Sequence, residues 1–263
     1  MQMTGGGMGR QRRLASGAGL DVRLSWYEPG AHMDRHVHDR HQISWLLAGE
    51  LRERSAGREF ELVDLSRGVK PAGCPHANVY GRSGSLILAL NIDPGSDLCD
   101  AIPGLDDWRW STTDGERKAV QDVLAAATML AEGDPVTDLA LADLVAGAHL
   151  APGQTGDAPD PWLSRVRDWL HDDPDAHDLS GLAAAAGVHQ VHLSRSFTRH
   201  YGLSPSLYRL RCRVSRALAD LVGGASLAAA AQTGGFADQA HFTRATRRQT
   251  GLTPSHLRSL LAA

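Results

Sequence analysis

Four histidines fall within twelve residues, in the stretch AHMDRHVHDRHQ at positions 31–42. Neutral imidazole is a common ligand of transition metals, and it also changes charge near neutral pH. Such a group could bind a metal ion, line a ligand pocket, or lie on a solvated loop by chance. The choice among these roles depends on the elements that position the side chains and on the rest of the chain.

A second concentration of chemically active side chains lies at the other end of the sequence. From Leu179 onward there are ten arginines against two aspartates, Asp220 and Asp238, whereas residues 1–159 carry 15 Lys and Arg against 22 Asp and Glu. A basic module behind an acidic one predicts a polyanionic partner for the C-terminal part only.

The composition excludes several classes of protein. With 263 residues and 42% hydrophobic residues, the chain can form one large or two ordinary domains. We expect no membrane segment and no signal peptide, since no apolar run has the length that either requires. Three cysteines without a CxxC motif argue against a disulfide framework and a structural zinc finger. We therefore expect a cytoplasmic protein.

The histidine-rich stretch falls in a region of strand-like patterns. Between residues 20 and 92, apolar runs and alternations of four to eight residues are separated by Gly, Pro or Asp. This rhythm predicts an antiparallel β-sandwich or small barrel. Residues 1–19, which are rich in Gly and Arg, are interpreted as a flexible basic tail.

Helical spacing replaces the strand pattern from Asp114. Apolar residues recur at three- and four-residue intervals in 114–133 and again in 136–150, which predicts a helical hairpin. The hairpin could pack on the barrel or form a dimer interface. We assign residues 20–150 to one domain, 151–160 to a Pro-, Gly- and Asp-rich linker, and 161–263 to an all-helical domain.

The helical domain contains an internal repeat. Ala183 and Gly187 match Ala231 and Gly235 with an offset of 48 residues, and the match continues with an offset of 49 from His192 and His241 through GLSPS at 202–206 and GLTPS at 251–255. In each copy an alanine-rich helix ends at a glycine, and a second helix with one apolar and one basic face follows. This pattern is typical of a helix-turn-helix whose second helix enters a DNA major groove.

Residues 160–260 resemble the DNA-binding domain of AraC/XylS-type transcription regulators. The resemblance covers both helix-turn-helix units, the connecting helix and the motif GFADQAHFTRATRRQTGLTPS. It departs at Ala245 and Thr246, where the family has an aromatic residue matching Phe197, and we expect a looser core there. By motif position the resemblance implies these DNA-binding residues: Gln190, Val191, Ser194, Arg195, Arg199, Gln239, Ala240, His241, Arg244 and Arg248.

Base reading by these side chains has a physical basis. Arginine pairs with guanine and glutamine with adenine through two hydrogen bonds. For Arg195 and Arg244, a phosphate contact or an intramolecular ion pair competes with base reading.

Regulators of this kind join such a reader to a β-barrel sensor, and the N-terminal histidines resemble those of cupins. The resemblance implies His36, His38 and His76 as metal ligands, with Gln42 in place of the usual glutamate. Two residues apart on a strand, the first two would share a face, and a later strand could bring the third opposite. Three imidazoles suit one divalent Zn, Fe, Ni or Cu ion. An organic-ligand pocket without metal is the alternative.

The overall expectation is an α+β, non-enzymatic transcription regulator with a cupin-like barrel and a double helix-turn-helix. A small molecule or metal in the barrel would modulate its binding to double-stranded promoter DNA. Trp26, Trp45 and Tyr80 are candidates for the effector pocket. A homodimer and, for an activator, contact with RNA polymerase are further expectations. The alternatives are a metal-dependent cupin enzyme with an appended helical domain and a ligand-independent DNA-bending protein.

Overall fold

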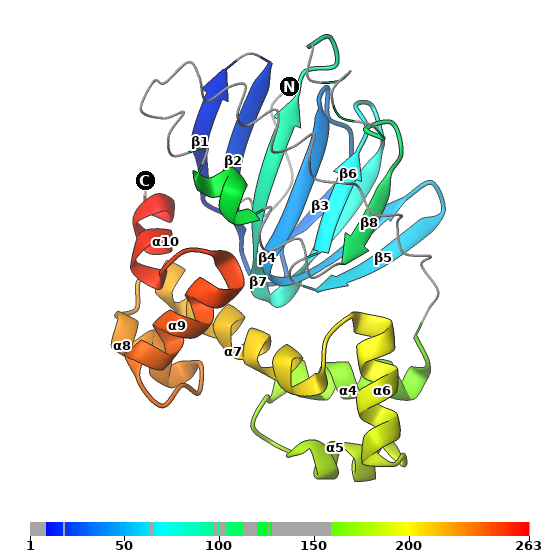
Figure 1. Cartoon of the computed structure of the whole chain (residues 1–263), viewed down its shortest axis with the longest axis vertical. Helices are drawn as coiled ribbons and strands as arrows, with labels where there is room; N and C mark the ends of the chain where they lie inside the picture. The colour runs from blue at the N-terminus through cyan, green and yellow to red at the C-terminus, as the bar shows by residue number, and fades with distance from the viewer. Residues whose placement is uncertain are drawn as a thin grey trace.

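The computed structural model of the chain combines an N-terminal antiparallel sheet with a C-terminal helical region (Figure 1), which confirms the α+β prediction. The structure describes residues 9–17, 19–63, 66–96, 99, 102, 104–112, 120–125, 127 and 159–262. In this part of the chain, no helix is long and apolar enough to cross a membrane.

In the described part of the chain, eight antiparallel strands form the sheet. They are β1 (Gln11–Gly17), β2 (Leu20–Tyr27), β3 (His32–His36), β4 (His41–Ser55), β5 (Arg58–Val63), β6 (Ser66–Lys70), β7 (His76–Ile92) and β8 (Arg109–Thr112). The hydrogen-bonded order is β1-β2-β7-β4-β6-β8. In addition, β3 pairs with the first residues of β7, and β5 pairs with the last residues of β4.

The long central strands β4 and β7 pair with each other, and this pairing is irregular at one place. Their pairing register shifts near Gly49, which has a positive φ and lies so close to Gly84 that a Cβ atom would collide with the carbonyl oxygen of Gly84. Hydrogen bonds do not join β1 to β8 among the described residues. The predicted antiparallel sheet is therefore confirmed, whereas closure into a barrel stays a prediction.

The sheet begins earlier than the sequence indicated. Residues 11–17 form the edge strand β1, paired with β2, so the interpretation of residues 1–19 as a flexible tail was wrong for this segment. The reason is that β1 is mostly exposed and polar, with Ala15 its one fully buried residue. An edge strand of this kind has little of the apolar alternation by which strands are recognised.

The first predicted helix after the sheet is partly described. Residues 120–125 and 127 are helical, and Val120, Val123, Leu124 and Ala127 are buried, as their spacing predicted. The rest of this helix, the second helix of the predicted hairpin and residues 151–158 of the linker lie outside the described residues.

The C-terminal region contains seven helices among the described residues. They are α4 (Pro161–Asp172), α5 (Leu179–Ala186), α6 (Gln190–Tyr201), α7 (Pro205–Val222), α8 (Leu227–Thr233), α9 (Gln239–Thr250) and α10 (Pro254–Leu261). Ser204 and Thr253 cap α7 and α10 with their hydroxyls, and a proline follows each of them in the first turn. The predicted repeat therefore corresponds to repeated helices.

The helices pack into two separate hydrophobic clusters. The C-terminal half of α7 and helices α8, α9 and α10 share one core with β2, β4 and β7 of the sheet. Helices α4, α5 and α6 and the N-terminal half of α7 form a second core, in which Val63 is the one buried sheet residue described. The two helix-turn-helix units are thus attached to the sheet in different ways.

Candidate metal centre and nucleic-acid interface

The structure brings His36 and His38 of the histidine-rich stretch together with His76. His36 at the end of β3 pairs across the sheet with His76 at the start of β7, as the sequence predicted for a later strand. His38 lies beyond the end of β3, so regular strand alternation does not place it. Its ring nevertheless lies 5.0 Å from the rings of both His36 and His76, and those two are 4.4 Å apart.

The potential ligand atoms of these three residues all lie within 4.8 Å of one another. The Nδ1 atom of His36 is 2.8 Å from the carbonyl oxygen of Asp34, and Nδ1 of His76 is 3.0 Å from that of Cys74. A carbonyl oxygen accepts, so each Nδ1 is the protonated nitrogen. Each Nε2 is therefore left with a free lone pair, in the orientation typical of metal-binding histidines.

The Nε2 atoms of His36 and His76 are buried and have no hydrogen-bond partner among the described residues. Burying a nitrogen lone pair without a partner is unfavourable. Binding a metal ion would satisfy both lone pairs. The donor set fits a divalent transition metal, because neutral imidazoles suit Zn, Cu, Fe and Ni.

The electrostatic environment disfavours protonation of His38 and His76. Burial lowers the pKa of both to about 3, and the ammonium group of Lys70 lowers both further. A metal ion competes with protons for the imidazole lone pair. The lone pairs of these two imidazoles are therefore available to a cation at neutral pH.

Gln42, the fourth predicted ligand, is engaged elsewhere. Its amide nitrogen donates to Asn91 at 2.9 Å, and its amide oxygen accepts hydrogen bonds from Ser44 at 3.0 Å and Lys70 at 3.2 Å. None of these three hydrogen bonds joins Gln42 to His36, His38 or His76.

Sequence reasoning missed Glu53, a fully buried carboxylate near this site. Its Oε1 accepts hydrogen bonds from the indole nitrogens of Trp108 and Trp110, both at 2.7 Å, and its Oε2 lies 3.2 Å from Lys70. Glu53 stands two positions after Leu51 in an alternating strand, so the period of two had already placed it facing inward.

The candidate effector residues do not form one group. Trp26 and Trp45 belong to the core shared with the helices, whereas Tyr80 belongs to a separate cluster and stacks on Tyr27 with 3.9 Å between ring centroids. All three are buried. Their role as a pocket stays a prediction.

Both halves of the repeat are helix-turn-helix units. In the first, Gly187 (φ 70°) ends α5, and His189 caps α6 by accepting a hydrogen bond from the backbone nitrogen of Val191 at 3.3 Å. In the second, Gly235 (φ 72°) follows α8, and Asp238 caps α9 by accepting from the backbone nitrogen of His241 at 2.6 Å. The left-handed glycines explain why this residue recurs in the repeat.

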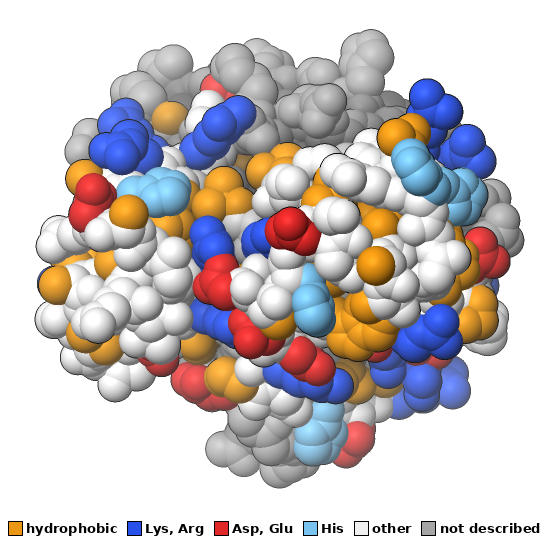
Figure 2. All heavy atoms as spheres, turned by 90° about the horizontal axis from the view of Figure 1, so that it is seen from below, with side chains coloured by type: hydrophobic (Ala, Val, Ile, Leu, Met, Phe, Trp, Pro, Cys, Tyr) orange, Lys and Arg blue, Asp and Glu red, His pale blue; other side chains and the backbone are white. Residues whose placement is uncertain are grey.

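The predicted reading residues lie on the outer surfaces of α6 and α9. Ser194 and His241 are half-buried, and the other eight are exposed. The buried faces of the two helices carry the core residues Leu193, Phe197, Phe242 and Thr246. Figure 2 shows Lys and Arg side chains at both sides of the molecule seen from below, with acidic and basic side chains close together between them.

Two exposed residues on these faces were missed. His192 lies one turn before Arg195 and Ser196 on α6, and its ring contacts Trp162 of α4 with 5.6 Å between centroids. Arg247 lies one turn after Arg244 on α9. Their spacing of three residues from predicted readers was the available signal.

The helical domain also matches known proteins. Residues 182–259 match the model of a family described as "Helix-turn-helix domain". The chain is 27% identical over 183 residues to a putative AraC-like transcription regulator of Streptomyces antibioticus, which covers 65% of the chain and 58% of that protein. The chain thus spans a little over half the length of this relative. The resemblance predicted from the repeat is confirmed: residues 182–259 are a helix-turn-helix domain similar to those of AraC-type regulators.

Comparison with solved structures gives distant likenesses. ToxT from Vibrio cholerae O395 has a TM-score of 0.41 and 11% identity, over 93% of this chain and 99% of ToxT. A cupin superfamily protein from Desulfitobacterium hafniense DCB-2 has a TM-score of 0.30 and 18% identity, over 32% of this chain and 75% of that protein.

Proposed function

We propose that the protein is a sequence-specific DNA-binding transcription regulator. The observation that carries the proposal is the pair of homologous, outward-facing helices α6 and α9, each behind a glycine turn and each bearing exposed arginines. Ten residues would contact DNA: Gln190, Val191, Ser194, Arg195, Arg199, Gln239, Ala240, His241, Arg244 and Arg248. Since the partner is chromosomal DNA, we place this activity in the cytoplasm.

The test starts by selecting binding sites from a random DNA library with the full-length protein. Arg195→Ala and Gln239→Ala should then each weaken binding to the selected site by about 1–3 kcal/mol and relax its base preference. Arg35→Ala, which removes an exposed arginine from the sheet, is the matched control. If both helix variants bind as the wild type does, α6 and α9 are not the reading helices.

We further propose that one divalent transition metal binds at His36, His38 and His76 and modulates DNA binding. Support comes from the converging ligand atoms and the two buried, unpartnered Nε2 atoms. The bound ion would supply positive charge that draws the three imidazoles together, and an organic effector could complete its coordination. Regulation requires that the ion bind one conformation of the protein better than another.

Metal titration of the purified, chelator-treated protein tests this second proposal. Zn or Ni should raise the melting temperature of the wild type and leave that of His76→Ala unchanged, because only the native site gains from ligand binding. His32→Ala is the matched control, since His32 is exposed on β3, the strand that carries His36. Equal responses of all three proteins would place the metal elsewhere.

The same histidine geometry favours a second candidate function, a metal-dependent cupin enzyme with an appended helical domain. The two candidates differ in what depends on the helices. A regulator loses its function in Gln239→Ala, whereas turnover at the histidines would not change. Homodimerisation and contact with RNA polymerase stay predictions.

A further inference from the structure

The two helix-turn-helix units differ in what holds them to the sheet. Helices α8, α9 and α10 enter the core of the sheet with Ala230, Phe242, Leu257 and Leu261, all at most 2% exposed. Gln249 on α9 also donates a hydrogen bond to the backbone oxygen of Leu47 on β4, at 3.2 Å and fully inside. This attachment is therefore buried and mainly apolar.

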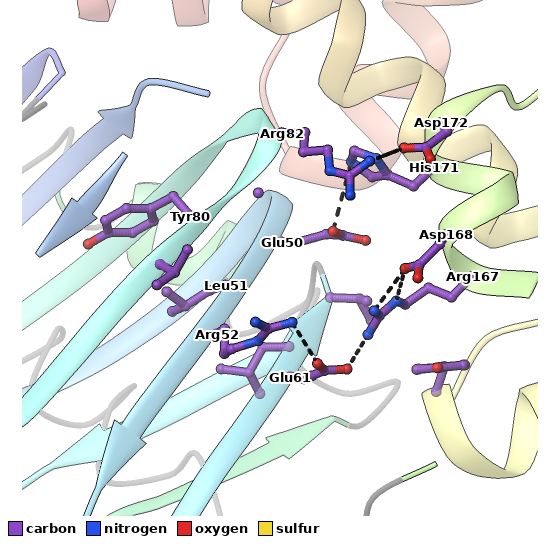
Figure 3. A pocket seen from close by; sticks show the side chains of 15 residues that line it. Glu50, Leu51, Arg52, Glu61, Tyr80, Arg82, Arg167, Asp168, His171 and Asp172 are labelled. Carbon is purple, nitrogen blue, oxygen red and sulfur yellow. Dashed lines mark hydrogen bonds and ion pairs between the residues drawn. The ribbon is translucent and has the colours of Figure 1, made fainter. Parts of the chain in front are cut away.

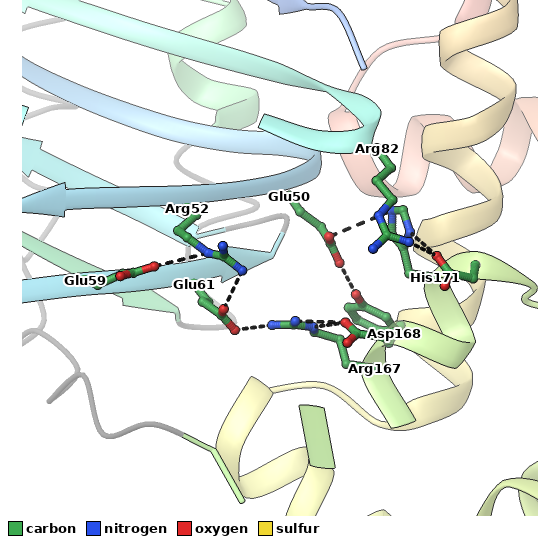
Figure 4. Close-up of polar contacts among 10 residues, drawn as sticks. Glu50, Arg52, Glu59, Glu61, Arg82, Arg167, Asp168 and His171 are labelled. Atoms are coloured by element: carbon green, nitrogen blue, oxygen red, sulfur yellow. Dashed lines mark hydrogen bonds and ion pairs between the residues drawn. The ribbon is translucent and has the colours of Figure 1, made fainter. Parts of the chain in front are cut away.

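The first unit meets the sheet through polar side chains. Arg167 on α4 pairs with Glu61 on β5, and Arg82 on β7 pairs with Asp172 on α4 at 2.5 Å (Figure 4). The hydroxyl of Tyr208 on α7 donates to Glu50 on β4. We call these six residues the latch.

Several side chains of the latch are exposed to solvent. The side chains of Arg82 and Asp172 are 73% and 53% exposed, and that of Glu61 is 33% exposed. Solvent and salt screen ion pairs of this kind, so each contributes little. Arg167, at 14% exposed, is the best covered of the charged members. Val63 is the only buried sheet residue described in the core of the first unit, so little apolar area adds to the attachment.

A half-open pocket of about 280 Å³ lies at this interface, between β4, β5 and β7 on one side and α4 and α6 on the other (Figure 3). Interfaces built for permanent contact leave little space unfilled. The packing here is incomplete, as expected where two surfaces separate and rejoin.

We propose that the first helix-turn-helix unit is a releasable module, held against the sheet by the latch while the second unit stays fixed. The C-terminal half of α7 is anchored in the sheet core by Val214, Ala217, Leu218 and Leu221. Release therefore lets α4, α5 and α6 swing on the N-terminal half of α7. The spacing between the two outward-facing helices changes as the latch opens.

The experiment measures exposure of each interface by thiol labelling of the full-length chain, with the labelled peptides resolved by mass spectrometry. Val63→Cys reports on the first interface and Ala245→Cys on the second, both at buried positions. Raising the salt concentration from 0.05 to ~1 M, which shortens the screening length to about 3 Å, should speed labelling at position 63 and not at position 245.

Charge reversal identifies the contact. Glu61→Arg and Arg167→Glu should each raise labelling at position 63 by roughly tenfold, and the double reversal should return it toward the starting rate. Arg54→Glu is the matched control, because Arg54 pairs at 2.7 Å with Glu59 inside the β4–β5 hairpin, away from the interface.

The salt series uses the intact latch, so it decides the matter even if a reversal variant does not fold. Labelling at position 63 that ignores both salt and charge reversal would overturn the proposal, as would equal acceleration at both positions. No DNA enters the measurement, so its outcome is independent of the proposed function.

Discussion

The two helix-turn-helix units share a sequence pattern and differ in their surroundings. Phe197 of the first unit packs against Tyr201 and Tyr208 within a core of its own, with ring centroids 4.6 and 5.4 Å apart. The matching position in the second unit is Thr246, which is fully buried where α9 lies against β4. The small residue was expected to loosen this core, yet here the sheet completes it. Repeated sequence thus gives repeated local structure without repeated packing.

The largest expected contrast comes from the core aromatics. Phe242→Ala and Phe197→Ala each remove a fully buried ring, at a cost of about 3–5 kcal/mol. Because Phe242 shares its core with the sheet, its loss should speed amide hydrogen exchange in β2 and β4 as well as in α9. Loss of Phe197 should affect α4, α5 and α6 alone. Matching exchange patterns in the two variants would refute the division into two cores.

The buried hydrogen bond of Gln249 should have the next largest effect. Gln249→Ala leaves the backbone oxygen of Leu47 without its partner in the interior, which costs about 1–3 kcal/mol. Gln239→Ala on the exposed face of the same helix should leave stability unchanged. Urea unfolding midpoints of both variants test this, and equal midpoints would mean that the contact with β4 contributes nothing.

The helix caps offer a smaller comparison. Asp238→Ala should destabilise α9 by about 1 kcal/mol, since the carboxylate accepts from a backbone nitrogen in the first turn. His189 is a weaker cap at the matching position, so His189→Asp should stabilise α6 by several tenths of a kcal/mol. Thermal unfolding of both variants measures the two shifts. A loss of stability in His189→Asp would show that the imidazole does more than cap the helix.

The smallest effect separates the two attachments by pH. Burial by itself would raise the pKa of Glu61, but Arg167 and Arg52 lower it below its ordinary value. The contribution of Glu61 is therefore complete above the unfolded pKa of about 4.5 and is lost as pH falls through the lower folded pKa.

Wild type and Glu61→Gln should thus differ in unfolding free energy by no more than about 1 kcal/mol at pH 6, and this difference should shrink toward pH 3. The difference between wild type and Gln249→Ala should stay constant over this range, because a neutral hydrogen bond does not titrate. A constant difference for Glu61→Gln would mean that its carboxylate is not held by charge.

The sequence by itself determined the α+β class and the two helix-turn-helix units, and it placed the predicted DNA-binding residues on their outer surfaces. Glycine turns, caps and apolar periodicity are local signals in the sequence. They occur in both copies of the repeat, with Gly187 in the first and Gly235 in the second. The pairing of β3 with β7 brings His36 opposite His76, as expected for a histidine on a later strand, whereas His38 joins them from beyond the end of β3.

Only the tertiary structure decided which other groups meet. Glu53 faces two tryptophans more than fifty residues away, Gln42 bonds to Asn91 rather than to the histidines, and Arg167 finds Glu61 across the domain boundary. Charged and amide side chains pair with whichever polar group the fold places beside them. Sequence periodicity does not reveal which group that will be. For the same reason, the different attachment of two matching units became visible only in three dimensions.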